Sequence, residues 1–118
     1  MFQDDWLQRQ IQQIADAIAH IAGASAGATE EVDDLLDDAY GKLLGPHREF
    51  LNAVDPATLA HLLGDPARIR ALAELTALEM QRTDDTATAA RLRHRGLGLL
   101  DALDETTEKD EELRRTMS

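Results

Sequence analysis

The chain has 118 residues, of which 43% are hydrophobic and only 3% aromatic, and it contains no cysteine. That length fits a single domain, and the lack of cysteine excludes disulfides, thiolate nucleophiles and cysteine-ligated zinc. The net charge of −11 opposes binding to nucleic acid and to anionic lipid, so neither partner is expected.

The aliphatic composition favours helices. Ala and Leu are strong helix formers, whereas the β-branched and aromatic residues typical of strands are scarce. We therefore predict an all-α fold, a compact bundle of five to six helices. The acidic N-terminus lacks the basic and apolar regions of a signal peptide, and no segment is apolar enough to span a bilayer. We expect a soluble, cytoplasmic protein.

Residues 5–22 are predicted to form the first helix, because aliphatic side chains recur there at steps of four and three residues. They are Leu7, Ile11, Ile14, Ile18 and Ile21, with Trp6 at the N-terminal end. This is the spacing of heptad a and d positions. Two interpretations stay open, the core face of one helix in a bundle and a self-pairing seam. From the second we predict a homodimer whose interface is formed by these six residues.

A connector of small residues at 23–28 separates that helix from a second one. Glu30 and Glu31 suit the positive end of a helix dipole at its start. An apolar stripe follows, and Gly45-Pro46 ends the helix.

After a short turn over residues 47–54, two similar segments begin helices. In Asp55-Pro56 and in Asp65-Pro66, the carboxylate can accept hydrogen bonds from free amides. The proline stands at the first helical position, where its missing N–H costs nothing. The first of these helices ends before Gly64, and the second continues to about residue 82.

A last long helix precedes the charged C-terminal segment 105–118. Thr107 and Asp110 match a capping box, but the segment has only two apolar side chains. We therefore expect a weakly helical or frayed tail attached to a single domain at residues 1–104.

The helix pair at residues 65–103 resembles one tetratricopeptide hairpin, with Ala77, Ala89 and Gly96 at small positions and Met80 at a bulky one. More broadly, four segments follow one another along the chain: WLQRQIQQIADAIAHI, DLLDDAYGKLLG, LNAVDPATLAHLL and LAELTALEMQRTDDTATAARLRHRGLGLLDAL. This order of segments is similar to that of a family of small uncharacterised bacterial all-helical proteins. The resemblance implies a helical fold and no known activity.

An acidic run on the second helix raises the question of a metal site. One alternative is a small all-α magnesium-dependent nucleotide or phosphate hydrolase that uses Glu30, Glu31, Asp34 and Asp38. The second acidic motif that such an enzyme needs is missing, and the other interpretation is a solvated acidic helix face. The histidines and serines stand in no catalytic or metal-binding motif, so neither a catalytic residue nor a cofactor is expected.

Charge is distributed unevenly along the chain. The second half carries six clustered arginines, at positions 68, 70, 82, 91, 93 and 95. They either form ion pairs inside the bundle or meet an acidic helix of a partner, such as a second copy. We therefore predict a helical protein-interaction or structural protein that acts through self-association or a partner helix.

Overall fold

The computed structural model describes the backbone of residues 2–23 and 29–118, and the side chains of residues 8–23 and 30–118. Within these ranges the chain forms helices and no strand, so the all-α prediction is confirmed. The helices are α1 (Phe2–Ala22), α2 (Thr29–Leu44), the 3₁₀ helix η1 (Gly45–Phe50), α3 (Pro56–Leu63), α4 (Pro66–Arg82), α5 (Thr86–Asp101) and α6 (Glu108–Met117). The connector predicted at 23–28 lies almost wholly outside the described residues.

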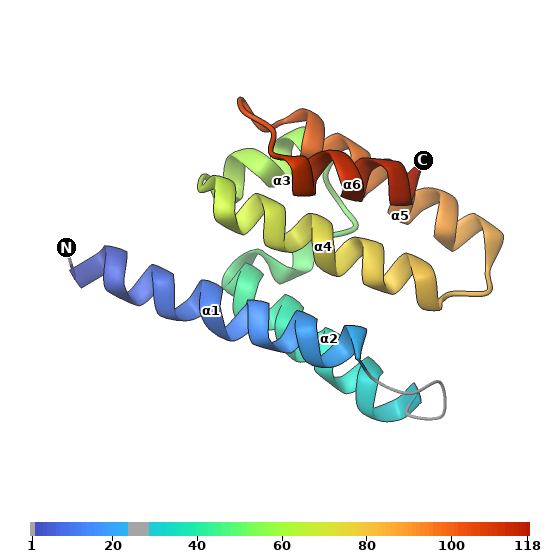
Figure 1. Cartoon of the computed structure of the whole chain (residues 1–118), viewed down its shortest axis with the longest axis horizontal. Helices are drawn as coiled ribbons and strands as arrows, with labels where there is room; N and C mark the ends of the chain where they lie inside the picture. Colours follow the sequence, from blue (N-terminus) through green and yellow to red (C-terminus); the bar gives the residue numbers. More distant parts are fainter. Residues whose placement is uncertain (1, 24–28) are drawn as a thin grey trace.

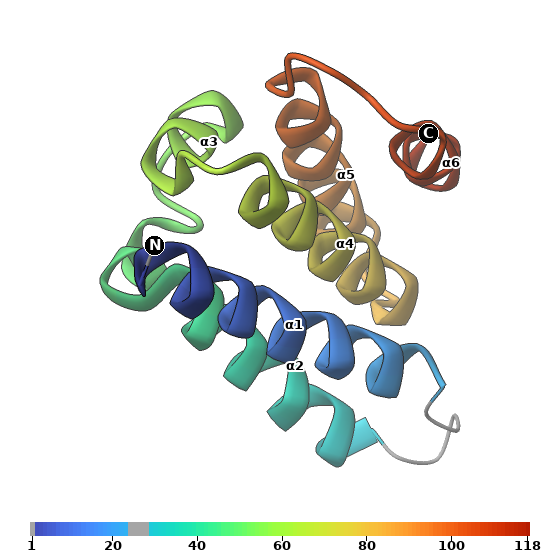
Figure 2. The ribbon, with the colours of Figure 1, turned by 60° about the vertical axis from the view of Figure 1, so that its left-hand side comes forward.

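Helix α4 lies at the centre of the bundle and contacts every other α-helix. The antiparallel pair α1 and α2 packs on one side of it, and α3, α5 and α6 lie on the other (Figures 1 and 2). The position of α4 follows from its sequence, since buried residues occur on nearly every side of it between Ile69 and Ala77. A helix that is apolar on most of its circumference is stable only when neighbours cover it.

The helix starts predicted from Asp-Pro pairs are confirmed. The Asp55 carboxylate accepts a hydrogen bond from the Thr58 amide at 3.0 Å, and the Asp65 carboxylate accepts one from the Ala67 amide at 2.8 Å. Asp85 caps α5 in the same way, accepting a hydrogen bond from the Thr88 amide at 2.9 Å. These caps supply partners for amides that a helix leaves unpaired at its first turn.

The C-terminal segment differs from the prediction, because it is a capped and docked helix and not a frayed tail. The predicted capping box forms, with Thr107 and Asp110 each accepting a hydrogen bond from the other's amide. Asp110 also pairs with Arg70 of α4, at 3.0 Å. Met117 is only 1% exposed and fills the space beside Gly96, where a β-carbon would lie 2.2 Å from its sulfur. Helix α6 therefore packs against α4 and α5.

In the part of the chain that the structure describes, no helix has the length and apolarity needed to cross a membrane.

Candidate functional site

A polar cavity of about 260 Å³ opens where α2, η1, α4 and α5 meet, and we call it the polar cleft. It is lined by three acids and three arginines, with a few apolar side chains between them. The charged residues are Asp33, Asp37, Glu79, Arg48, Arg91 and Arg95. Most ligand sites have predominantly apolar walls with a few polar groups, so this cavity is more highly charged than usual.

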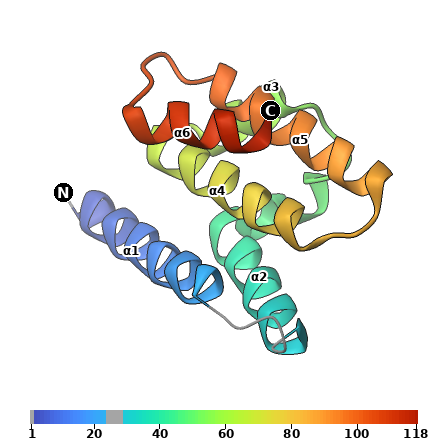
Figure 3. The same ribbon diagram turned by 45° about the vertical axis from the view of Figure 1, so that its right-hand side comes forward.

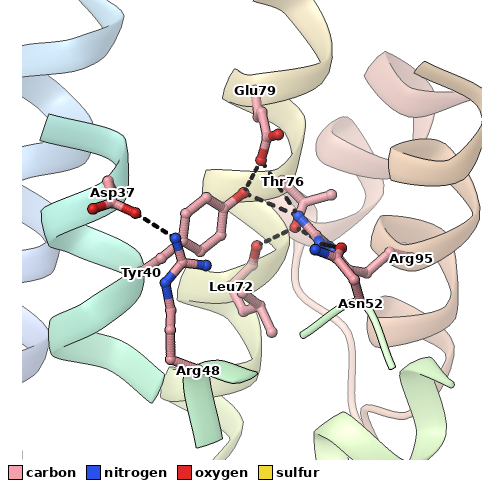
Figure 4. Close-up of polar contacts among 8 residues, drawn as sticks. All are labelled: Asp37, Tyr40, Arg48, Asn52, Leu72, Thr76, Glu79 and Arg95. Carbon is pink, nitrogen blue, oxygen red and sulfur yellow. Dashed lines mark hydrogen bonds and ion pairs between the residues drawn. The ribbon is translucent and has the colours of Figure 1, made fainter. Parts of the chain in front are cut away.

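The floor of the polar cleft is a buried hydrogen-bonded cluster centred on Tyr40 (Figure 4). The Tyr40 hydroxyl donates to Glu79 Oε1 at 2.7 Å and accepts a hydrogen bond from Arg95 Nη2 at 3.0 Å. The same Nη2 lies 3.5 Å from Glu79 Oε1. Tyr40 is 4% exposed and Arg95 is 7% exposed, so a tyrosine, an arginine and a glutamate join α2, α5 and α4 inside the bundle.

The remaining donors of Arg95 also have partners. Its Nε donates to Thr76 Oγ1 at 3.2 Å, and the Thr76 hydroxyl in turn donates to the Leu72 carbonyl at 2.7 Å. Its Nη1 reaches Asn52 Oδ1 at 3.5 Å, at the long end of hydrogen-bond distance. The guanidinium is therefore held from three sides, and a buried charge is tolerated only when it is paired in this manner.

Burial raises the pKa of Tyr40 well above its ordinary value; Arg95 opposes this rise and Glu79 adds to it. The hydroxyl therefore keeps its proton at neutral pH and acts as a hydrogen-bond donor. A general base needs a pKa near the working pH. The cluster is suited to fixing the positions of charged groups, not to moving protons.

A second layer of charge lies above this floor. Arg48 of η1 pairs with Asp37 of α2, and its guanidinium carbon lies 5.2 Å from the centre of the Tyr40 ring. The guanidinium carbon of Arg95 lies 5.6 Å from the same centre. Both distances are within the range of cation–π attraction, so the tyrosine ring stabilises both arginines.

Two charged residues of the polar cleft differ from the rest. Arg91 of α5 and Asp33 of α2 are exposed and form no hydrogen bond or ion pair with any side chain that the structure describes. The polar cleft therefore contains one cation and one anion with no hydrogen-bonded or ion-paired partner among the described side chains; Arg91 has only the longer-range attraction of Asp85 at the start of its helix.

The acids predicted for magnesium, Glu30, Glu31, Asp34 and Asp38, are exposed along α2. Glu31 lies 3.9 Å from His20, and Asp38 pairs with Lys42 at 3.1 Å. Across residues 8–23 and 30–118, no three His, Asp or Glu side chains come together in a group that could hold a metal ion. The second acidic wall that the hydrolase alternative requires is missing from these residues.

Part of the seam predicted on α1 lies against the chain's own core. Ile14 is 0% and Ile21 3% exposed, so these two side chains follow the intramolecular interpretation and are not available to a second copy. Ile11 and Ile18 are half-buried. The other two predicted interface residues, Trp6 and Leu7, lie outside the described side chains.

A second cavity, of about 270 Å³, crosses α4 between α1 and α6, and we call it the α4 groove. Figure 3 shows α4 running between these two helices. Its apolar lining comes from all three helices and consists of Ile18, Ala77, Leu78 and Leu113. Its polar lining consists of Glu74, Gln81, Lys109, Asp110, Glu112 and Thr116.

Sequence reasoning missed the Tyr40 cluster, although one signal pointed to it. Arg95 stands three residues after Leu92 and four before Leu99, both fully buried, so it lies on the apolar stripe of its helix. A charged residue in such a stripe needs an internal partner. The pattern does not identify the partner, because Tyr40 and Glu79 come from other helices.

Comparisons of the chain with protein-family models, with curated proteins and with solved structures gave no match. The resemblance to small bacterial helical proteins and to a tetratricopeptide hairpin therefore stays a prediction.

Proposed function

We propose that the chain is a protein-interaction module that binds a basic, amphipathic helix of a partner protein in the α4 groove. The observation that carries the proposal is an apolar floor with an acidic border. Ile18, Leu78 and Leu113 are each half-buried, so apolar side chains of a partner could cover the part of their surface that is still exposed to water. Amphipathic helices bind grooves of this kind through apolar anchors on one face.

Glu74 supports a basic partner. It is half-buried in the α4 groove, and burial raises its pKa; Lys109 opposes the rise and Asp110 adds to it. Its carboxylate accepts no hydrogen bond from any other described side chain or amide. A lysine or arginine on the bound helix would supply the missing partner and relieve the cost of burying this carboxylate.

The overall charge favours a different protein over a second copy. Each copy carries a net charge of −11, so two copies repel one another at low salt. A basic helix is attracted by the same field. Self-association through the α4 groove is accordingly the rival outcome that the test must detect.

The test uses ¹⁵N-labelled full-length chain and a synthetic helical peptide with leucines on one face and lysines on the other. We expect saturable chemical-shift changes in α1, α4 and α6, and much weaker binding of the same peptide with glutamates in place of the lysines. Leu113→Gln and Glu74→Gln should each weaken binding about tenfold. Leu62→Gln is the matched control, because Leu62 is an exposed leucine of α3 outside the groove.

Two results would overturn the proposal. If the peptide shifts the exposed acids of α2 as strongly as the groove, the binding is non-specific attraction to an acidic surface. If sedimentation finds a dimer that Leu113→Gln converts to a monomer, the groove serves a second copy and not a partner helix.

A further inference from the structure

The polar cleft is lined by three acids and three arginines, and the proposed binding of a partner helix in the α4 groove does not use them. Two of its arginines are paired internally, Arg48 with Asp37 and Arg95 with Glu79. The unpaired charges that remain are Arg91 on α5 and Asp33 on α2, one of each sign. Figure 4 shows these two helices on opposite sides of the Tyr40 cluster, with α4 between them.

We propose that the polar cleft binds a small zwitterion of the free amino-acid class, with its carboxylate on Arg91 and its ammonium group on Asp33. The carboxylate would lie near the side-chain NH₂ group of Asn52, which can donate a hydrogen bond, and near the positive charge of Arg95, whose donors are bonded within the cluster. Arginine pairs well with carboxylates because its planar fork of donors matches their two oxygens.

The lining favours a ligand that carries one charge of each sign over a ligand of a single charge. A phosphate or dicarboxylate would bring its negative charge beside the carboxylates of Asp33, Asp37 and Glu79. A diamine would meet the three arginines in the same way. A zwitterion carries one charge of each sign, so its carboxylate can pair with Arg91 and its ammonium group with Asp33.

The size of the cavity limits the ligand further. A volume of about 260 Å³ is near the lower end of small-molecule sites, so it suits an amino acid better than a nucleotide. Leu36 and Leu51 provide apolar wall on which a side chain of the ligand can pack. The hydrogen bonds of Tyr40 and Arg95 already hold the floor of the polar cleft in place, so its side chains lose little conformational entropy when a ligand binds.

The proposal is tested by titrating the full chain with individual free L-amino acids, by calorimetry and by following the Nε signals of Arg91 and Arg95. We expect at least one amino acid to bind saturably. Its N-acetyl and its amide derivatives, each of which lacks one of the two charges, should bind at least tenfold more weakly.

Variants of the two unpaired residues locate the site. Arg91→Gln and Asp33→Asn should each weaken binding about tenfold, and both positions are exposed, so the fold is retained. Arg93→Gln and Asp34→Asn are matched controls, since they remove the same charge from exposed positions of the same helices outside the cavity.

The proposal is overturned if no free amino acid binds at millimolar concentration. It is also overturned if acetate or inorganic phosphate binds as tightly as the amino acid, or if the control variants weaken binding as much as the cleft variants. Failure here leaves the α4 groove untouched, because the two cavities share no lining residue.

Discussion

Tyr40→Phe is the sharpest test of the buried cluster, because it removes one oxygen atom and leaves the ring in place. The hydroxyl makes two hydrogen bonds to charged groups, to Glu79 at 2.7 Å and from Arg95 at 3.0 Å. Each bond of this type contributes about 1.5–3 kcal/mol. The full sum is not lost, since the Glu79 side chain is 36% exposed to water and already lies 3.5 Å from Arg95. We expect Tyr40→Phe to lower the free energy of unfolding by about 2 kcal/mol.

Urea unfolding followed by circular dichroism measures this loss. With a slope of about 2 kcal/mol per molar urea, the midpoint should fall by about 1 M while the slope stays constant. Glu79→Gln and the double variant complete a cycle, and the two changes should be non-additive because both groups belong to one network.

The pH dependence gives an independent measurement, since Tyr40 is the only tyrosine of the chain. Burial, opposed by Arg95 and reinforced by Glu79, raises the pKa of Tyr40 above its ordinary value of 10.0. The folded state therefore keeps a proton that the unfolded chain releases. The resulting stability is fully present below the ordinary pKa and is lost as the pH rises above it. Tyrosinate absorbance should appear together with alkaline unfolding, and Tyr40→Phe should weaken the pH dependence in that range.

A neutral Tyr40→Phe substitution would refute this reasoning. It would mean that the hydroxyl is equally well hydrated in the folded and the unfolded chain. Tyrosine ionisation near its ordinary pKa, without unfolding, would lead to the same conclusion.

Four further predictions use the same urea assay. Gly41→Ala should stabilise the fold by about 1 kcal/mol, because nothing lies within 4 Å of the new β-carbon. Gly98→Ala should destabilise it by about 1 kcal/mol, because the new β-carbon would lie 2.6 Å from the rigid ring of Pro56. Equal effects of the two substitutions would contradict the packing of α3 on α5. Asp65→Ala should cost about 1 kcal/mol through the lost cap, and no change would mean that α4 does not begin there. Ile14→Glu should cost about 4 kcal/mol or more, because it places an unpaired charge at a fully buried position, and a stable folded monomer would contradict the core role of this residue. Glu74→Gln should stabilise the free chain at neutral pH by about 0.5 kcal/mol or less. Because burial raises the pKa of Glu74, this added stability should vanish as the pH falls below the ordinary pKa of a glutamate. If the added stability persists in acid, it has another cause.

The helices and their starts were predictable because their signals are local. A cap such as Asp65 acts on an amide two residues away, and an apolar stripe repeats within a single helix. The seam on α1 was harder to interpret. A heptad repeat and a straight helix diverge by only about 20° per heptad, so two heptads cannot distinguish a dimer seam from a core face.

The docking of the C-terminal helix and the partners of Tyr40 could not be predicted for the opposite reason, because both depend on contacts between distant parts of the chain. Met117 docks into a space that exists only because residue 96 has no side chain, and α5 must already be in place to offer it. Tyr40 finds its partners 39 and 55 residues along the chain, on two other helices. Local propensity contains no information about such pairings, which depend on how the helices cross.

Both candidate sites occur where the residue type disagrees with the burial of its position. Arg95 occupies an apolar stripe and Glu74 is half-buried without a hydrogen-bond partner, whereas most other charged side chains that the structure describes are exposed. The two cases differ in what the chain provides: Arg95 is matched by Tyr40, Glu79 and Thr76, but Glu74 has only the distant attraction of Lys109. Sites that break local rules are expected where function requires it. An unsatisfied charge such as Glu74 is suited to recognising a partner that brings the opposite charge, which is why we assign the α4 groove to a basic helix. The satisfied Arg95 cluster instead forms a fixed floor beneath the exposed charges Arg91 and Asp33, which is why we assign the polar cleft to a small molecule.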